Sequence, residues 1–156
     1  MKRLFSIVAV GVLMFTTANL VLAQSDPRVG TWKLNAAQSK SDAAPRKSET
    51  RTYQASGDSI TMHAEVMNND GSKQVYGYTG KPDGRDNPWT GQPGGADTLA
   101  IKRSGNTITA ENKKGGKLLY TTRATVSKDG KVTTVDASGT NPSGVKTHDV
   151  QVFDKQ

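Results

Sequence analysis

The chain has 156 residues, of which 21 are Lys or Arg and 14 are Asp or Glu, so its formal net charge is +7. This length suits one domain and not two. Because the chain has no cysteine, neither disulfides nor zinc–thiolate sites can hold the fold, and stability has to come from apolar burial and backbone hydrogen bonds.

The first 23 residues have the pattern of a secretory signal peptide. Lys2 and Arg3 precede a long apolar run, and the sequence "VLA" follows before Gln24. Polar residues interrupt the run, which leaves it shorter than the about 20 apolar residues that a membrane-spanning helix needs. We therefore predict a signal-peptide helix cleaved after Ala23, export to the periplasm or the extracellular space, no integral membrane segment after cleavage, and one domain over residues 24–156.

The rest of the chain alternates short runs rich in Thr, Val, Ile and Tyr with turn signals such as "SGD", "NNDG" and "KDG". Gly, Asn and Asp supply the positive φ angles that tight hairpin turns require. The run at 60–66 has a period of two, because Ile60, Met62, Ala64 and Val66 alternate with polar residues. No stretch has convincing helical periodicity. The predicted strands cover residues 29–35, 47–55, 59–67, 72–80, 97–103, 107–113, 117–127, 131–139 and 145–154.

Short local turns between most of these strands predict an antiparallel up-and-down meander. Laid flat, such a sheet has two open edges, and closure into a barrel removes them. A sandwich is the alternative, but its crossovers need long connections, and only residues 36–45 and 81–96 are long enough. The sequence therefore favours an all-β barrel of roughly 8 to 10 strands.

The motif "VGTWKL" at 29–34 resembles the first-strand signature of the calycins, the family of lipocalins and fatty-acid-binding proteins. Gly30 and Trp32 match its Gly-x-Trp. The mature chain is also similar to a group of small secreted bacterial lipocalin-like proteins without an established activity. The resemblance implies that Trp32 packs across the closed end of a barrel and that Gly30 lets the entering chain approach closely.

Other family features are missing from the sequence. Residues 36–45 are too few for the two helices that cap the barrel of fatty-acid-binding proteins. The Arg-x-Tyr clamp of their last strand is replaced by Gln151, Val152 and Phe153. The resemblance therefore implies the fold but not the fatty-acid specificity.

The sequence holds no convincing catalytic, metal or nucleic-acid site. His63 shares a polar strand face with Glu65, and His148 and Asp149 fall on opposite faces, so neither pair favours acid–base chemistry. Two carboxylates in "DGRDN" at 83–87 do not match a calcium loop. Basic residues are scattered and not clustered with stacking aromatics. We expect no enzyme activity, no cofactor, no bound metal and no nucleic-acid partner.

A cavity inside the barrel is the favoured functional site. Small residues line the predicted strands, which indicates a narrow cavity or a packed one. They are Thr50, Thr52, Ala100, Thr109, Ala110, Thr122, Ala124 and Thr134. Trp89 lies in the long Pro- and Gly-rich connection, where functional residues are common, although it can also form a hydrophobic lid. The candidate ligand-binding residues are Trp89, Tyr53, Tyr78 and, if it points inward, Arg123.

Two functions follow from this prediction. The first is an exported lipocalin-like barrel that binds a small hydrophobic or amphipathic ligand without forming a covalent bond. The alternative is a structural or interaction module of the cell envelope with a filled barrel and no pocket. A void of a few hundred cubic ångströms favours the first, since ligand sites begin at about 300 Å³.

Overall fold

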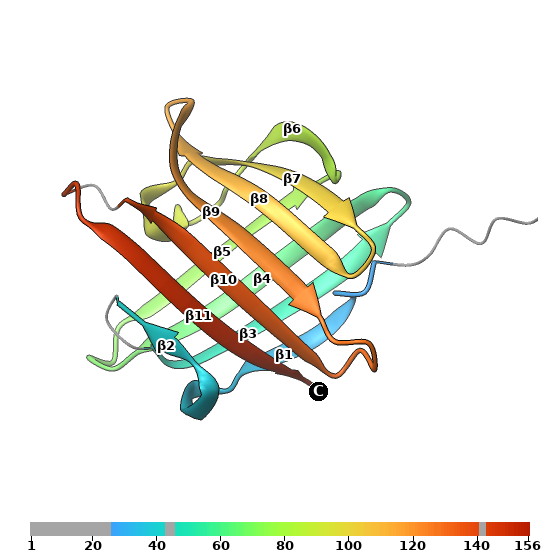
Figure 1. Cartoon of the computed structure of the whole chain (residues 1–156), viewed down its shortest axis with the longest axis horizontal. Helices are drawn as coiled ribbons and strands as arrows, with labels where there is room; N and C mark the ends of the chain where they lie inside the picture. Colours follow the sequence, from blue (N-terminus) through green and yellow to red (C-terminus); the bar gives the residue numbers. More distant parts are fainter. Residues whose placement is uncertain (1–25, 43–45, 141–142) are drawn as a thin grey trace, which may run out of the picture.

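The computed structural model of the protein describes residues 26–42, 46–140 and 143–156, so the predicted signal peptide lies outside the described residues. Ten strands lie side by side in one antiparallel sheet that curves round into a barrel (Figure 1). They are β1 (Gly30–Leu34), β3 (Arg46–Ser56), β4 (Ser59–Asn68), β5 (Lys73–Gly80), β6 (Asp83–Pro88), β7 (Thr98–Ser104), β8 (Thr107–Lys114), β9 (Lys117–Val126), β10 (Val132–Thr140) and β11 (Lys146–Lys155).

The strands follow one another round the barrel in a meander. Their order is β5-β4-β3-β1-β11-β10-β9-β8-β7-β6, so the first and last strands of the sequence lie together. The two ends of this order meet at a single bridge, in which Gly77 N–H donates to Thr90 O (3.1 Å) and Thr90 N–H donates to Gly77 O (2.8 Å). The barrel is therefore nearly closed, the prediction of an all-β antiparallel barrel is confirmed, and the sandwich alternative is wrong.

All nine predicted strands are present, with ends within one residue of the expected bounds. The two long connections hold further elements: the 3₁₀ helix η1 (Ala36–Gln38) and the strand β2 (Lys40–Ser41) in the first, and β6 and the 3₁₀ helix η2 (Pro93–Gly95) in the second. β6 escaped prediction because its residues do not alternate. It is held by pairing with β7, through a register shift between Asp83 and Asp86. No helix in the described part of the chain is long and apolar enough to cross a membrane.

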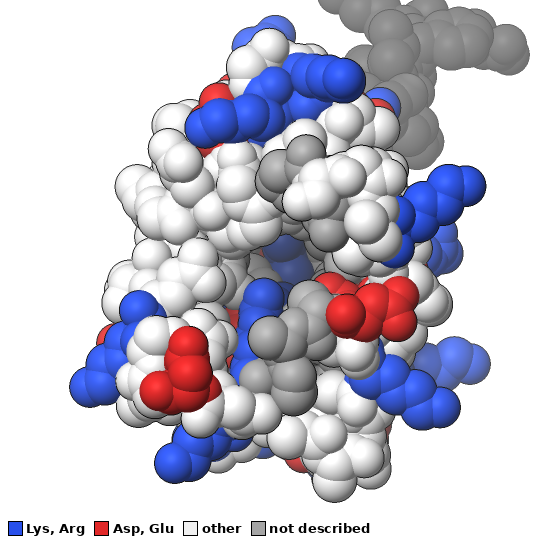
Figure 2. Space-filling model, turned by 90° about the vertical axis from the view of Figure 1, so that its left-hand side faces the viewer, with Lys and Arg blue, Asp and Glu red and all other residues white. Residues whose placement is uncertain are grey.

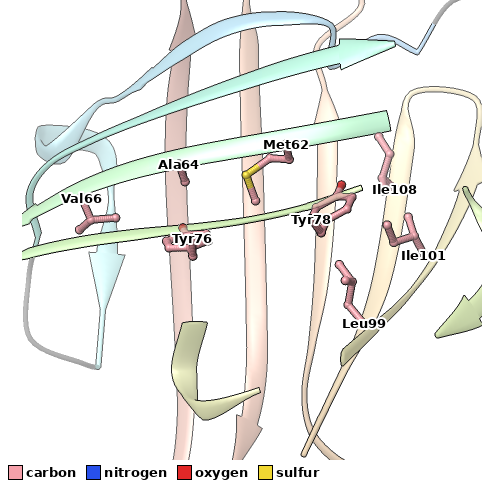
Figure 3. Packing of buried hydrophobic residues seen from close by; sticks show 8 residues of the cluster. All are labelled: Met62, Ala64, Val66, Tyr76, Tyr78, Leu99, Ile101 and Ile108. Carbon is pink, nitrogen blue, oxygen red and sulfur yellow. The ribbon is translucent and has the colours of Figure 1, made fainter. Parts of the chain in front are cut away.

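Two groups of buried apolar side chains fill part of the interior. The larger group comes from β4, β5, β7 and β8, and Figure 3 shows Leu99, Ile101 and Ile108 gathered beside Tyr78. The β4 members lie on the apolar face expected from the period of two, since burial alternates along that strand. The smaller group consists of Trp32, Val126, Val135 and Phe153.

Trp32 and Gly30 occupy one end of the barrel, which we call the closed end. Trp32 is 1% exposed, and its Nε1–H donates to Arg28 O at 2.6 Å. Gly30 has a φ of +123°, and a Cβ there would lie 2.9 Å from the Lys155 side chain. An L residue in this conformation would be strained, so the glycine lets the chain enter β1 beside the last strand.

Candidate ligand-binding cavity

The barrel contains a cavity of about 450 Å³. Along β11, Lys155 pairs with Trp32 at the closed end, and Lys146 pairs with Thr140 at the other end. Thr140 lines the cavity and Trp32 does not. Figure 2 looks onto the Thr140 end and shows a central hollow with Lys or Arg atoms inside it. The cavity therefore opens at the end away from Trp32, which we call the mouth.

A buried carboxylate on β3 organises one part of the wall. Glu49 accepts hydrogen bonds from Arg46, from Arg51 Nε (2.6 Å) and from the Tyr76 hydroxyl. Arg51 Nη2 also donates to Gln151 Oε1 at 2.9 Å, and its guanidinium lies over the Phe153 ring, 4.2 Å from the ring centroid. We call Arg46, Glu49, Arg51, Tyr76 and Gln151 the Glu49 cluster.

The Glu49 cluster carries a net positive charge. Burial alone would raise the pKa of Glu49, but Arg51, Arg46 and the Tyr76 hydroxyl outweigh it and hold that pKa below its ordinary value of 4.5. Burial raises the pKa of Tyr76 to about 12, so the phenol is neutral at pH 7. Two guanidinium cations thus face one carboxylate.

A second buried ion pair lies near the closed end. Arg28 binds Asp26 through Nε (3.0 Å) and Nη2 (2.8 Å), and it donates from Nη1 to the Tyr78 hydroxyl at 2.9 Å. Its guanidinium lies 5.2 Å from the Tyr53 ring centroid. The burial of Asp26 would raise its pKa, yet its bonds to Arg28 lower it, with a further contribution from Arg103. We call Asp26, Arg28, Tyr53 and Tyr78 the Arg28 cluster.

Three arginines, Arg28, Arg46 and Arg51, line the cavity, and they pair with only two buried carboxylates, Asp26 and Glu49. Two more carboxylates, Asp42 and Asp149, lie at the mouth. Their oxygens already accept from Ser41, from the Asp42 N–H and from the His148 N–H, bonds that hold β2 against β11. The inner part of the cavity therefore has one cation in excess, while its mouth is acidic.

Trp89 forms part of the wall opposite these mouth residues. Its ring packs edge-on against Tyr76 (5.8 Å between centroids) and Tyr78 (5.1 Å). Its Nε1–H donates to Asn112 Oδ1 at 3.0 Å. Trp89 follows β6 directly and lies next to Thr90 of the closing bridge, so it belongs to the barrel wall and not to a free loop.

Three of the four candidate ligand-binding residues line this one cavity: Trp89, Tyr53 and Tyr78. Arg123 does not. In β9 the side chains of Tyr120, Thr122 and Ala124 face the cavity, and strand alternation turns the exposed Arg123 to the outer face. The condition attached to Arg123, that it point inward, is not met.

Reasoning from the sequence missed the charged residues of the wall. The hairpin between β3 and β4 turns at Ser56 and Ser59, and this register places Glu49 opposite Val66, Arg51 opposite Ala64 and Tyr53 opposite Met62. Directly paired residues share a sheet face. The position of the turn signal "SGD" fixes this register, so it could have predicted that Glu49 and Arg51 face inward with the apolar residues of β4.

The histidines lie outside the cavity. His63 and Glu65 are exposed on β4, with 3.4 Å between Nε2 and Oε1. His148 Nε2 lies 3.1 Å from Asp136 Oδ2 on the outer face, and Asp136 raises the pKa of this imidazole. The described residues contain no group of three or more His, Asp or Glu side chains placed to hold a metal ion.

The barrel is similar to known proteins in structure but not in sequence. No family model and no curated protein matches the sequence. The zebrafish ileal bile acid-binding protein in complex with cholic acid superposes with a TM-score of 0.53 at 9% identity, over 83% of this chain and 99% of that one. The fluorescent protein UnaG superposes with a TM-score of 0.54 at 17% identity, over 82% and 96%. This chain therefore has the same barrel fold as these two proteins.

At these identities the likeness concerns the fold alone. The first-strand motif, with Gly30 and Trp32, therefore pointed to the right architecture. In place of the helix pair expected of fatty-acid-binding proteins, the described residues between β1 and β3 form η1 and β2. At such identities the roles of the cavity-lining side chains do not carry over from these proteins, so their function follows from their own geometry.

Proposed function

We propose that this protein binds a small amphipathic acid, non-covalently, inside the barrel. The observation that carries the proposal is the cavity of about 450 Å³, lined by aromatic and apolar side chains and by three arginines. Its volume falls within the range of about 300–1,000 Å³ typical of small-molecule sites. Such a void also argues against the alternative of a filled structural module.

The acidic group follows from the charge balance of the inner cavity. Arg46 and Arg51 share one carboxylate, so the Glu49 cluster has a positive charge without its own counterion. A charge in a desolvated wall is stabilised by an opposite charge brought close to it. The apolar part follows from Leu99, Ile101 and Ile108, which line the same cavity. The cholic acid in the zebrafish protein, an amphipathic acid in the same fold, supports this choice.

The proposal includes the setting in which binding takes place. The leader favours export to the periplasm or the extracellular space, in the manner of the small secreted bacterial lipocalin-like proteins that the sequence resembles. We expect binding without turnover, because neither His63 nor His148 lines the cavity, and the carboxylates at its mouth already accept hydrogen bonds that hold β2 against β11.

Titration of the mature protein with dodecanoic acid and with dodecanol tests the proposal, because the two probes share an alkyl chain and differ in charge. We expect the acid to bind at least about tenfold more tightly, equivalent to about 1.4 kcal/mol. Arg46→Gln should remove most of this preference. Arg123→Gln removes the same charge from the outer face and should leave the preference unchanged.

Two outcomes would contradict the proposal. Equal affinity for the acid and the alcohol, unchanged by Arg46→Gln, would show that the cavity does not select an acidic ligand. Binding of neither probe, combined with native mass spectrometry that finds no ligand on protein purified from its own host, would remove ligand binding altogether.

A further inference from the structure

One buried amide in the cavity wall has a hydrogen-bond donor group without a partner among the described residues. Asn112, on β8, is 1% exposed and lines the cavity. Its Oδ1 accepts from Trp89 Nε1–H. Because an indole N–H can only donate, this contact fixes which side-chain atom is the oxygen. The other atom, Nδ2, has no hydrogen-bond partner among the described residues.

A buried N–H donor without a partner is costly, since it gives up its bonds to water and gains none. An apolar residue of similar size would avoid this cost. Thr133 Oγ1 is the other buried polar side-chain atom that lacks a partner in the described part of the chain, but Thr133 does not line the cavity. Asn112 is thus where an unused donor and ligand-sized space coincide.

The position of Asn112 relates it to the arginines. In the strand order, β8 lies halfway round the barrel from β3 in either direction, so Asn112 lies on the wall opposite Arg46 and Arg51, while Tyr76 of the same cluster lies between them, against Trp89. A ligand whose acidic group lies against Arg46 and Arg51 reaches the Asn112 wall with its body and not with the same group. The donor therefore calls for a second polar atom, carried by the apolar part of the ligand.

We propose that Asn112 Nδ2 donates a hydrogen bond to an oxygen acceptor on the body of the ligand. This rests on the proposed function and narrows its ligand class to an amphipathic acid with a ketone, ether or hydroxyl oxygen along its hydrophobic part. Trp89 orients the amide by holding Oδ1, so that both donor hydrogens of Nδ2 remain available. An unsubstituted alkyl acid would leave this donor unpaired.

Affinities for dodecanoic acid and for oxododecanoic acids, with the ketone moved along the chain, test the inference. We expect at least one oxo isomer to bind about tenfold more tightly than dodecanoic acid, the gain from one well-formed hydrogen bond in a desolvated site. Asn112→Leu should abolish that ratio and still bind dodecanoic acid. Asn112→Asp keeps an acceptor for Trp89 and has no donor at a pH where the new carboxyl is ionised, so it should abolish the ratio there too.

Thr133→Val is the matched control, because it removes the other unpartnered polar atom away from the cavity, and it should leave the ratio unchanged. Equal affinity of the wild type for every oxo isomer and for dodecanoic acid would overturn the inference and leave the proposed function standing. A tenfold ratio that survives both Asn112 variants would also overturn it. If no acid binds, the proposed function fails first. A crystal structure showing only water on Nδ2 in the oxo-acid complex would reject the donor role directly.

Discussion

Each tryptophan of the described chain donates its indole N–H to one acceptor, and the two acceptors give them different roles. Trp32 donates to the backbone oxygen of Arg28, and this bond holds the segment before β1 at the closed end of the barrel. Trp89 donates to the side chain of Asn112, which lines the cavity. Trp32, whose motif matches the first-strand signature, therefore lies behind the cavity wall without lining it, whereas Trp89 is part of that wall.

Glu49 should make the protein sensitive to acid. A carboxyl group whose folded-state pKa is depressed adds stability at pH values above its unfolded pKa, and this stability is lost as the pH falls through the folded value. The pKa of Glu49 is held below 4.5 by Arg51 and Arg46 against the effect of burial. We expect the free energy of unfolding, measured with urea, to fall as the pH is lowered below about 4.5, with a smaller part from Asp26, whose pKa is lowered from 3.8.

Glu49→Gln isolates this contribution. The variant should lose about 3–5 kcal/mol at pH 7, because the paired arginines stay buried without their carboxylate, and its stability should depend less on pH between 3 and 5. The ¹³C resonance of the Glu49 carboxyl in the wild type gives a second reading that does not require a stable variant. A midpoint at or above 4.5 would show that the arginines do not outweigh the effect of burial on the carboxyl group.

At the scale of elements, the strands were predictable because each hairpin carries its own turn residues. β9 and β10 meet at "KDG", and β4 and β5 at "NNDG", so the local sequence sets both pairing partners and register. β6 carries no such signal, since its pairing with β7 spans a longer connection. The bridge from Gly77 to Thr90 depends on how the whole sheet curves, which no local pattern records.

This bridge should be the point where the barrel opens most readily, and Gly91 controls it. Gly91 has a φ of +74°, and a Cβ there would lie 2.0 Å from Val75 O on β5. Gly91→Ala should therefore push the end of β6 away from β5 and lower the hydrogen-exchange protection of the Gly77 and Thr90 amides by tenfold or more.

Gly105→Ala is the matched control for this change. Gly105 also has a positive φ, +57°, but a Cβ there would meet nothing within 4 Å. Both variants pay the cost of about 1–2 kcal/mol for a left-handed L residue, and only Gly91→Ala should expose the two bridge amides. Equal loss of protection in both would mean that general destabilisation, and not opening of the seam, is being measured.

At the scale of the molecule, the sequence could predict a barrel but not whether it is hollow. The expected small residues of the lining are partly present, since Ala110, Thr122 and Ala124 face the cavity, but Thr109 and Thr134 do not. The volume depends on how far large side chains such as Trp89 reach across from other strands. That reach is set by the curvature of ten strands together, so it appears only once the barrel is assembled.

Filling this space should separate binding from stability. Ala124, on β9, lines the cavity and contacts both apolar groups. Ala124→Leu places a larger side chain in open space, so we expect the ligand-free protein to keep its stability or gain up to about 1 kcal/mol by urea unfolding. The affinity for dodecanoic acid should fall about tenfold or more, because the ligand and the new side chain compete for one volume.

Thr125→Leu is the control on the outer face of the same strand and should leave the affinity unchanged. A loss of affinity shared by both variants would point to distortion of β9. If Ala124→Leu lowers the free energy of unfolding by about 1–3 kcal/mol, the usual cost of overpacking, the space beside Ala124 is already filled. An unfilled cavity lowers the stability of the ligand-free protein, and we expect such a cost where the space serves to bind a ligand. Higher stability together with lower affinity in Ala124→Leu would therefore identify this interior as a binding site.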